Sequence, residues 1–330
     1  MLAGAVLTGV LGWIFSQILP RPTPADKIFS ICTMKPTEVH KDCFTSEILT
    51  AIDKDPAQTD AIFSGLWQLA IDGRITDDPR IFSDIAHEAG MQLAEKNIDL
   101  KQAFQYCGSS FKQGCMHGVI MEYVDNKYHG DVDVQTLKKI CEGFDDPLSK
   151  NNCIHGLGHE LAAKVTKNLS DVLDLCEEIS TDKSAESACE SGVLMEYSKG
   201  TAGSGQHSHE PVGQKELPCR DLPDKYQEVC YVSQGSYGQY NPGQQDFVKS
   251  YEYCSSIPEA YVQHCMLAVS ERAVMAAAEN IVQLNDFCEE IKDPKNKKMC
   301  QDSLISVSKT QFDDKNFSDS LETYVSENSD

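Results

Sequence analysis

The chain has 330 residues, a net charge of −22 and a hydrophobic content of 41%, which is ordinary for a globular protein. Its length allows one large fold or two domains. The acidic balance excludes nucleic acid and anionic membrane surfaces as electrostatic partners, and it favours cationic partners or metal ions.

The cysteine content indicates an oxidising compartment. The sequence has fourteen cysteines, and a cytosolic chain of this length rarely carries so many unless they hold metal clusters. The spacing C-x-x-C, typical of zinc ribbons and thioredoxin-like sites, does not occur. We therefore predict disulfides and a location in the cell envelope outside the cytoplasm, either periplasmic or secreted.

The N-terminal segment 2–19 is almost wholly apolar, and its length fits a short membrane span or a signal sequence. No Lys or Arg precedes this run, so the positive-inside rule does not support export. The cysteine content decides the prediction: residues 1–25 form a signal or membrane anchor, and the chain is anchored or exported. Residues 26–83 are predicted to form a helical capping region with a disulfide-closed start.

The cysteines fall into closely spaced pairs that recur along the chain. The pairs are Cys32 and Cys43, Cys107 and Cys115, Cys141 and Cys153, Cys176 and Cys189, Cys219 and Cys230, Cys254 and Cys265, and Cys288 and Cys300. From Cys107 onward the repeat is about 35 residues, which is typical of stacked helical hairpins. We predict local disulfides within the pairs; pairing between units is the alternative that sequence leaves open.

The fold class predicted from this period is all-α, an α/α-hairpin repeat solenoid of about seven units over residues 84–310. In each unit one helix begins at the second cysteine of a pair, and another ends at the next first cysteine. Three residues after the second cysteine, every unit carries a small residue, which permits close helix packing: Gly118, Gly156, Gly192, Ser233, Ala268 and Ser303. The acidic tail 311–330 is predicted to be a capping helix at most, followed by disorder.

The segment from Ala188 to Gly200, with Cys189, Gly192 and Tyr197, resembles the first helix of cysteine-rich Sel1-like repeats, which are relatives of the tetratricopeptide class. The spacing of Cys107 and Cys115 is similar to a boundary between such units. The resemblance implies an α/α solenoid with one disulfide per repeat and a role in binding a protein partner. It implies no site residues, because the histidine-rich stretch 153–160 is not part of that pattern.

Histidines recur at one position of successive units and point to a metal site. His87, His117 and His155 align, and His159 lies one turn beyond His155. Imidazoles suit zinc, copper or iron. The carboxylates predicted to complete the set are Glu122, Glu160 or Glu196, and a glutamate from a neighbouring unit fits better than Glu160, which points about 100° away from His159.

The function predicted from these patterns is an extracytoplasmic helical-repeat binding scaffold whose His-lined site holds a transition metal. One alternative is a metal-dependent enzyme using His155 and His159, although no known hydrolase, P-loop or dinucleotide-binding motif accompanies them. The other is a purely structural interaction protein in which the histidines only pack. His207 and His209, in a Gly-rich loop, form a weaker metal candidate.

Overall fold

The computed structural model describes residues 22–75, 81–96, 98–108, 111–128, 133–164, 168–199, 217–237, 240–241, 244–276, 281–311 and 315–328. Within these residues the protein is all-α, with sixteen α-helices, three short 3-10 helices and one hairpin of two-residue strands. The predicted all-α class is confirmed. The apolar segment 2–19 and the pair His207 and His209 lie outside the described residues.

The N-terminal region is a small helical unit closed by a disulfide. It contains α2 (Pro24–Thr33), η1 (Thr37–Val39), α3 (His40–Lys54), η2 (Pro56–Gln58) and α4 (Thr59–Ile71). Thr23 caps α2 through a reciprocal capping box with Asp26. Cys32 and Cys43 link the end of α2 to the start of α3, as predicted for this segment.

Long and short helices alternate through much of the remaining chain. The long helices are α5 (Ile81–Glu95), α7 (Lys112–Tyr128), α9 (Pro147–Lys164), α11 (Lys183–Lys199), α12 (Asp224–Tyr237), α14 (Glu259–Ala276) and α16 (Pro294–Gln311). The shorter helices are α6 (Leu100–Tyr106), α8 (Val134–Cys141), α10 (Leu169–Ile179), α13 (Phe247–Ser256) and α15 (Ile281–Glu289). After α16 comes α17 (Lys315–Asn328), which is as long as α12. Between α11 and α13 lie η3 (Cys219–Asp221) and the antiparallel pair β1 (Tyr240–Asn241) and β2 (Gln244–Gln245).

The long helices begin before the second cysteine of each pair, whereas the sequence pattern placed their start at that cysteine. The start of α9 shows the physical reason: Asp146 accepts the backbone N–H of Ser149, and Pro147 occupies the first turn. Asp182 caps α11 in the same way through the N–H of Ala185. Each second cysteine therefore lies inside its helix, where its side chain is buried.

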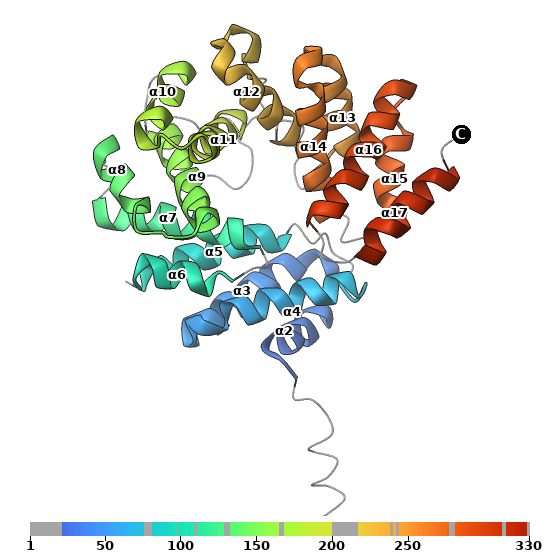
Figure 1. Ribbon diagram of the computed structural model, residues 1–330. Coiled ribbons are helices and arrows are strands. Elements are labelled where there is room, and N and C mark those ends of the chain that lie inside the picture. Colours follow the sequence, from blue (N-terminus) through green and yellow to red (C-terminus); the bar gives the residue numbers. More distant parts are fainter. Residues whose placement is uncertain are drawn as a thin grey trace, which may run out of the picture.

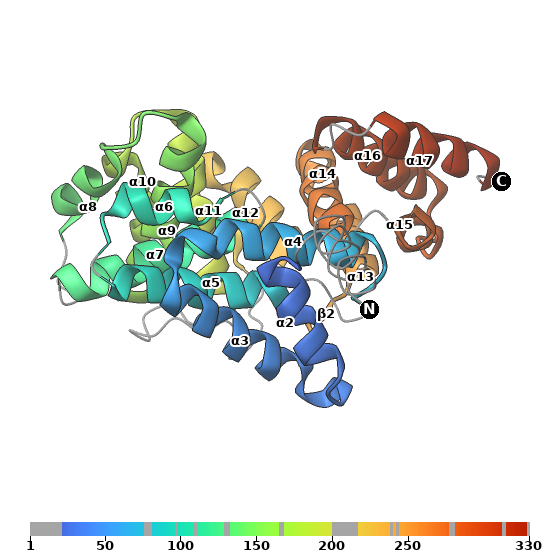
Figure 2. The same ribbon diagram turned by 90° about the horizontal axis from the view of Figure 1, so that it is seen from below.

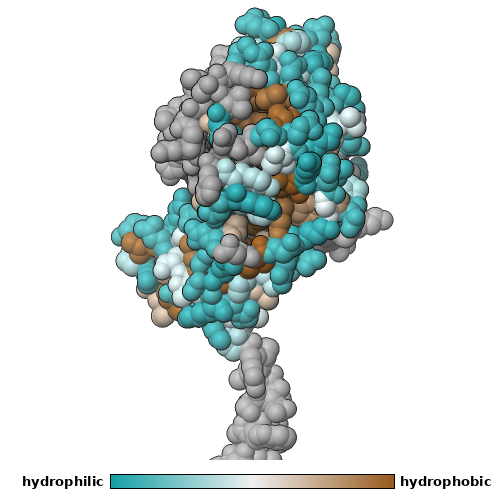
Figure 3. Space-filling model, turned by 90° about the vertical axis from the view of Figure 1, so that its left-hand side faces the viewer, coloured by the Kyte–Doolittle hydropathy of each residue, from teal (hydrophilic) through white to brown (hydrophobic). Residues whose placement is uncertain are grey.

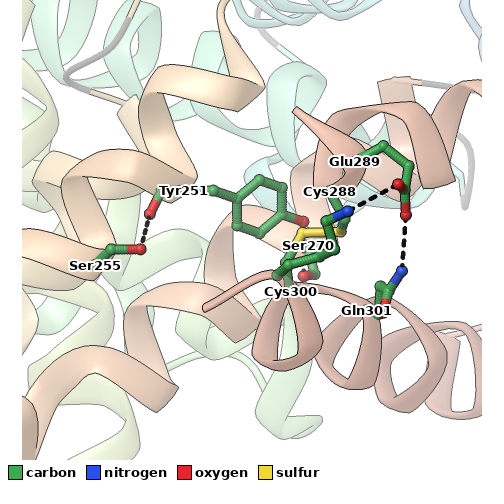
Figure 4. Close-up of a disulfide and its surroundings, with 8 residues drawn as sticks. Tyr251, Ser255, Ser270, Cys288, Glu289, Cys300 and Gln301 are labelled. Carbon is green, nitrogen blue, oxygen red and sulfur yellow. Dashed lines mark hydrogen bonds and ion pairs between the residues drawn. A yellow bond between two sulfur atoms is a disulfide. The ribbon is translucent and has the colours of Figure 1, made fainter. Parts of the chain in front are cut away.

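All seven predicted local disulfides are present, and none joins two distant units. Their Cα–Cα distances of 5.5 to 5.8 Å are ordinary for disulfides. Figure 4 shows Cys288 and Cys300 joining α15 to α16, beside the hydrogen bond of 3.1 Å that Gln301 donates to Glu289. Seven intramolecular disulfides fit an oxidising environment outside the cytoplasm.

The long helices pack on one another in chain order, and glycines set how closely they approach. A methyl group at Gly118 of α7 would lie 1.9 Å from the His87 carbonyl oxygen of α5, and one at Gly192 of α11 would lie 2.2 Å from the His155 carbonyl oxygen of α9. At Gly156 the nearest group on α7 is instead the Ile120 side chain, at 3.0 Å. The pairs α5/α7 and α9/α11 are therefore in backbone contact, and α7 and α9 pack less extensively.

Figure 1 shows the helices following an arc in chain order, with α8 and α10 on the outer side of α9 and α11. Figure 2 shows the helices from below, with α8 and α10 on the left of the view and α15 to α17 on the right. Most of the described residues on the face drawn in Figure 3 are hydrophilic, which agrees with the high content of charged residues. Among the described helices, none is long and apolar enough to span a bilayer.

The C-terminal segment contains a helix in the place where the sequence allowed a capping helix. The segment predicted as an acidic tail contains α17, a helix of 14 residues. Leu321 and Val325 are buried on one face of this helix, and α17 packs on α15 and α16. The apolar spacing of four residues on an otherwise polar helix is sufficient to hold it against the last pair.

Candidate metal site

Three buried histidines from two neighbouring helices meet between α7 and α9. His117 lies on α7, and His155 and His159 lie one turn apart on α9. One ring nitrogen from each residue lies within 4.8 Å of the other two, and the residues are only 7%, 4% and 3% exposed. Within the described part of the chain, this is the cluster of histidine, cysteine and acidic groups with the spacing of a metal site.

The three rings form one packed cluster. His117 stacks on His155 with ring centroids 4.4 Å apart, and His159 stands edge-on to His155 with centroids 4.9 Å apart. His117 and His159 are also neighbours, at 5.0 Å between centroids. The cluster therefore lies between α7 and α9, whose backbones are not brought into contact by a pair of facing glycines.

Two of the ring nitrogens have fixed roles. His155 Nδ1 lies 2.9 Å from the carbonyl oxygen of Ala188 on α11, and because a carbonyl only accepts, this nitrogen is the donor. His159 Nδ1 donates to Glu196 Oε1, also on α11, at 2.6 Å. With Nδ1 protonated on both rings, the lone pairs of the neutral rings lie on Nε2.

The two Nε2 atoms face each other at 3.1 Å. Two lone pairs at this distance repel unless a cation, either a proton or a metal ion, lies between or beside them. Two imidazole ligands of a tetrahedral zinc ion are about 3.3 Å apart, given Zn–N bonds of about 2.0 Å. The spacing of the α9 pair is thus close to that of two ligands on one ion.

The close packing of α9 and α11 is what brings the supporting oxygens to the histidines. A methyl group at Gly158 would lie 2.1 Å from the Cys189 carbonyl oxygen, and Gly192 meets the same stretch of α9 from the other side. At this separation the Ala188 carbonyl and the Glu196 side chain reach the two rings directly. Hydrogen bonds behind metal-ligating histidines fix the ring orientation and raise the basicity of the ligand.

A network of ion pairs holds α7 to α9 beside the cluster. Lys164 of α9 pairs with Glu160 at 2.7 Å and with Asp125 of α7. Glu160 is 2% exposed, and a buried carboxylate of this kind needs an opposite charge. The pair therefore accounts for Glu160, one of the predicted ligands, without a metal ion.

Three of the seven candidate ligands, His87, Glu122 and Glu160, have other surroundings and are not brought into the cluster. His87 of α5 directs its Nε2 at Met121 Sδ of α7, at 3.0 Å. Glu160 pairs with Lys164. Burial raises the pKa of Glu122, and the negative charge of Glu95 raises it further. The structure thus gathers His117, His155 and His159 and leaves out His87, Glu122 and Glu160.

The sequence pattern did not assign the two groups on α11 that orient the histidines. Glu196 is one of three candidate glutamates in the repeat, and the repeat pattern does not point to the Ala188 carbonyl. A signal for Glu196 is present in the repeat: it lies in the unit after His159, at the position of Glu122 and Glu160. A backbone carbonyl has no sequence signal, because every residue has one.

Chemically, the cluster offers three nitrogen ligands in a buried site. Three imidazoles and one open position suit zinc, copper or iron. The side chains described around the rings include one carboxylate, Glu196, already bonded to His159, so the cluster carries little negative charge of its own.

Comparisons of the chain with models of protein families, with curated proteins and with solved structures find no match.

Proposed function

We propose that this protein is a disulfide-stapled helical scaffold that binds one transition-metal ion through His117, His155 and His159. The observation that carries the proposal is the pair of Nε2 atoms 3.1 Å apart, each on a ring whose Nδ1 donates to an oxygen of α11. A metal ion turns the repulsion of these lone pairs into two bonds. His117, whose nitrogen lies within 4.8 Å of both, supplies the third through a change of its side-chain torsions.

The finer architecture belongs to the same proposal. The period of about 35 residues and the chain-order packing of the long helices support an α/α repeat solenoid related to Sel1-like and tetratricopeptide-like proteins. Such a scaffold offers an extended surface to a protein partner. The apolar segment 2–19 supports export, with or without retention as a membrane anchor.

The burial of the three histidines favours a scaffold that holds the metal ion over an enzyme that reacts with a substrate at the ion. All three histidines are more than nine-tenths buried, so a substrate reaches the ion only if α7 and α9 separate. A metal-dependent enzyme remains the second candidate, because three histidines leave one coordination position for water or substrate. The looser packing of α7 and α9, compared with their neighbours, is the observation that favours it.

The test is metal analysis of the purified chain after loading with zinc, copper(II) or iron(II) and removal of excess ion. The expected result is one ion per chain for one of these metals. The variants His155→Ala and His159→Ala should each lose it, while the control His264→Ala, whose side chain is 56% exposed and pairs with Glu228, should keep it.

Absence of bound metal under every loading condition would overturn the proposal. The facing nitrogens would then share a proton, and the structural alternative would stand. If metal binds, hydrolysis of ester and phosphate model substrates separates the two remaining candidates: turnover that disappears in His159→Ala supports the enzyme, and its absence supports the scaffold.

A further inference from the structure

A hollow of about 450 Å³ lies between α11, α12 and α14, apart from the histidine cluster. Its apolar lining comes from Val229 and Val232 of α12 and from Leu267 and Ala268 of α14. Four glutamates also line it: Glu186, Glu190, Glu228 and Glu271. The combination of an aliphatic floor and carboxylates suits a ligand with a carbon chain and a positive charge.

The basic side chains at the hollow already contact acidic ones. Lys183 contacts Glu186 at 2.8 Å, and His264 contacts Glu228 at 2.8 Å. Lys225 pairs with Asp174 at 3.1 Å and with Glu177. These three basic side chains are therefore bonded to carboxylates other than Glu190 and Glu271.

Glu190 and Glu271 make no hydrogen bond or ion pair with the described residues, although both line the hollow. Glu190 is only 6% exposed, so its carboxylate has lost most of its water without gaining a partner. Such a group is costly in the folded protein unless a ligand supplies the opposite charge.

The repeat shows how unusual Glu190 is. It directly follows a second cysteine, and at this buried position other long helices carry Met116, Ile154, Tyr231 and Met266. In α16 the residue is polar, Gln301, but it bonds to Glu289 at 3.1 Å. A carboxylate without a partner has thus replaced a core side chain at one site, where it faces a hollow.

We propose that this hollow binds a primary alkylammonium group, with the ammonium between Glu190 and Glu271 and the carbon chain on Val229, Val232 and Leu267. The acidic net charge of the protein draws such cations to its surface. The same chemistry is found in a free polyamine and in a lysine side chain of a peptide. The proposal is independent of the metal site, so either can fail without the other.

The raised pKa of Glu190 agrees with the burial of this carboxyl group beside the hollow. Burial, with the nearby charge of Glu186, raises the pKa of Glu190 to about 7. Lys183, Glu186, Lys225, Glu228, His264, Glu271 and, beyond the hollow, Glu177 are the charged groups around it. A bound ammonium favours the ionised carboxylate, so binding should strengthen between pH 6 and pH 8, as Glu190 gives up its proton.

The test is isothermal titration calorimetry of the full chain at pH 8 with spermidine and with Nα-acetyl-lysine amide, which keeps the ε-ammonium group. Acetyl-norleucine amide, which has the carbon chain without the charge, serves as the neutral probe. At least one amine should bind, and the norleucine compound should bind at least tenfold more weakly. Binding of spermidine alone identifies the small-molecule source, and binding of the lysine compound identifies a peptide.

Two variants at Glu190 separate binding from folding. Glu190→Gln should weaken the amine at least tenfold, and Glu190→Met should abolish binding while the protein stays folded, because methionine fills this position in α7 and α14. Glu142→Gln removes one exposed charge elsewhere and should change little. Failure of both amines to bind at millimolar concentration, or equal affinity in Glu190→Gln, overturns the proposal.

Discussion

The pairs α5/α7 and α9/α11 are built alike but place different side chains at their contact. In both pairs, glycines bring the helix backbones together: Gly90 with Gly118 in the first, and Gly158 with Gly192 in the second. Three residues before the first glycine of each pair lies a histidine, His87 before Gly90 and His155 before Gly158. One turn later α5 has Met91, whereas α9 has His159. At these two positions α5 therefore carries one histidine and α9 carries two.

The difference shows how one repeat gains a candidate metal site. In both pairs the glycine contacts fix the distance between the two helix backbones, and the second helix carries a glutamate, Glu122 or Glu196. Only α9 supplies a histidine for that glutamate to bond, at 2.6 Å. The third histidine, His117, comes from the opposite side because α7 packs on α9. The histidine at position 159, together with His117 of α7, thus distinguishes the candidate metal site from the packed pair α5/α7.

The largest expected effect is the loss of the metal in His159→Met, which gives α9 the side chain of Met91. Bound metal should fall from about one ion per chain to below about a tenth, because the remaining histidines leave an incomplete ligand set. Metal analysis after loading measures it. His87→Met is the matched control in the other pair, and equal loss in both variants would show that the ion is elsewhere.

Removal of the disulfide before His155 makes α9 resemble α5, which has Ile85 in place of the cysteine. The double variant Cys141→Ala, Cys153→Ile should lower the free energy of unfolding by about 3 kcal/mol, through the entropy of the unfolded chain. Denaturant unfolding measures the change. The folded variant should still bind metal, since the ligands are unaltered; if metal is lost at full folding, the disulfide itself positions the histidines.

An alanine in place of the glycine at each close helix contact should show which contact supports metal binding and which supports only the stability of the fold. Gly158→Ala places a Cβ 2.1 Å from the Cys189 carbonyl oxygen, and Gly90→Ala places one 1.9 Å from that of Cys115. Each should cost about 2 kcal/mol of unfolding free energy by forcing the helices apart. Only Gly158→Ala should also weaken metal binding, because it moves Ala188 and Glu196 away from the rings. Equal effects on metal affinity would contradict the assignment.

Substitution of Glu196, which accepts the hydrogen bond from His159, should weaken metal binding less than substitution of His159 does. It should weaken metal binding more than substitution of Glu122 does. Glu196→Gln should weaken metal binding by about 10-fold to 100-fold, because the ring loses its charged acceptor. Glu122→Gln, at the equivalent position of α7, should have little effect on affinity. Competition with a chromophoric chelator measures both, and an unchanged affinity in Glu196→Gln would remove this residue from the site.

The smallest effect concerns Glu190, which stands on α11 where α7 carries Met116. Burial raises the pKa of Glu190 to about 7, so the folded protein holds this proton more tightly than the unfolded chain. Its contribution to stability is therefore complete at low pH and declines as the pH rises through 7. Glu190→Met should raise the melting temperature more at pH 8 than at pH 5. A pH-independent gain would contradict the shift.

The repeat carried much of this architecture in the sequence. The disulfide pairs and the small residues after each second cysteine were readable because each depends on spacing alone. The helix starts were misplaced because caps such as Asp146 lie outside the repeat signature. The alignment grouped His87 with His117 and His155, but it could not show which helix pairs are close. The close approach of two helices depends on a second glycine, Gly90 in α5 and Gly158 in α9. At the equivalent position α7 has Ile120.

The three-histidine site is tested most directly by X-ray absorption spectroscopy at the edge of the bound metal in the loaded, full-length protein. We expect three imidazole nitrogens at about 2.0 Å from the metal, and one fewer imidazole around any ion that His117→Ala retains. A shell of sulfur atoms, a shell of oxygen atoms without imidazole, or a spectrum unchanged in His117→Ala would contradict it.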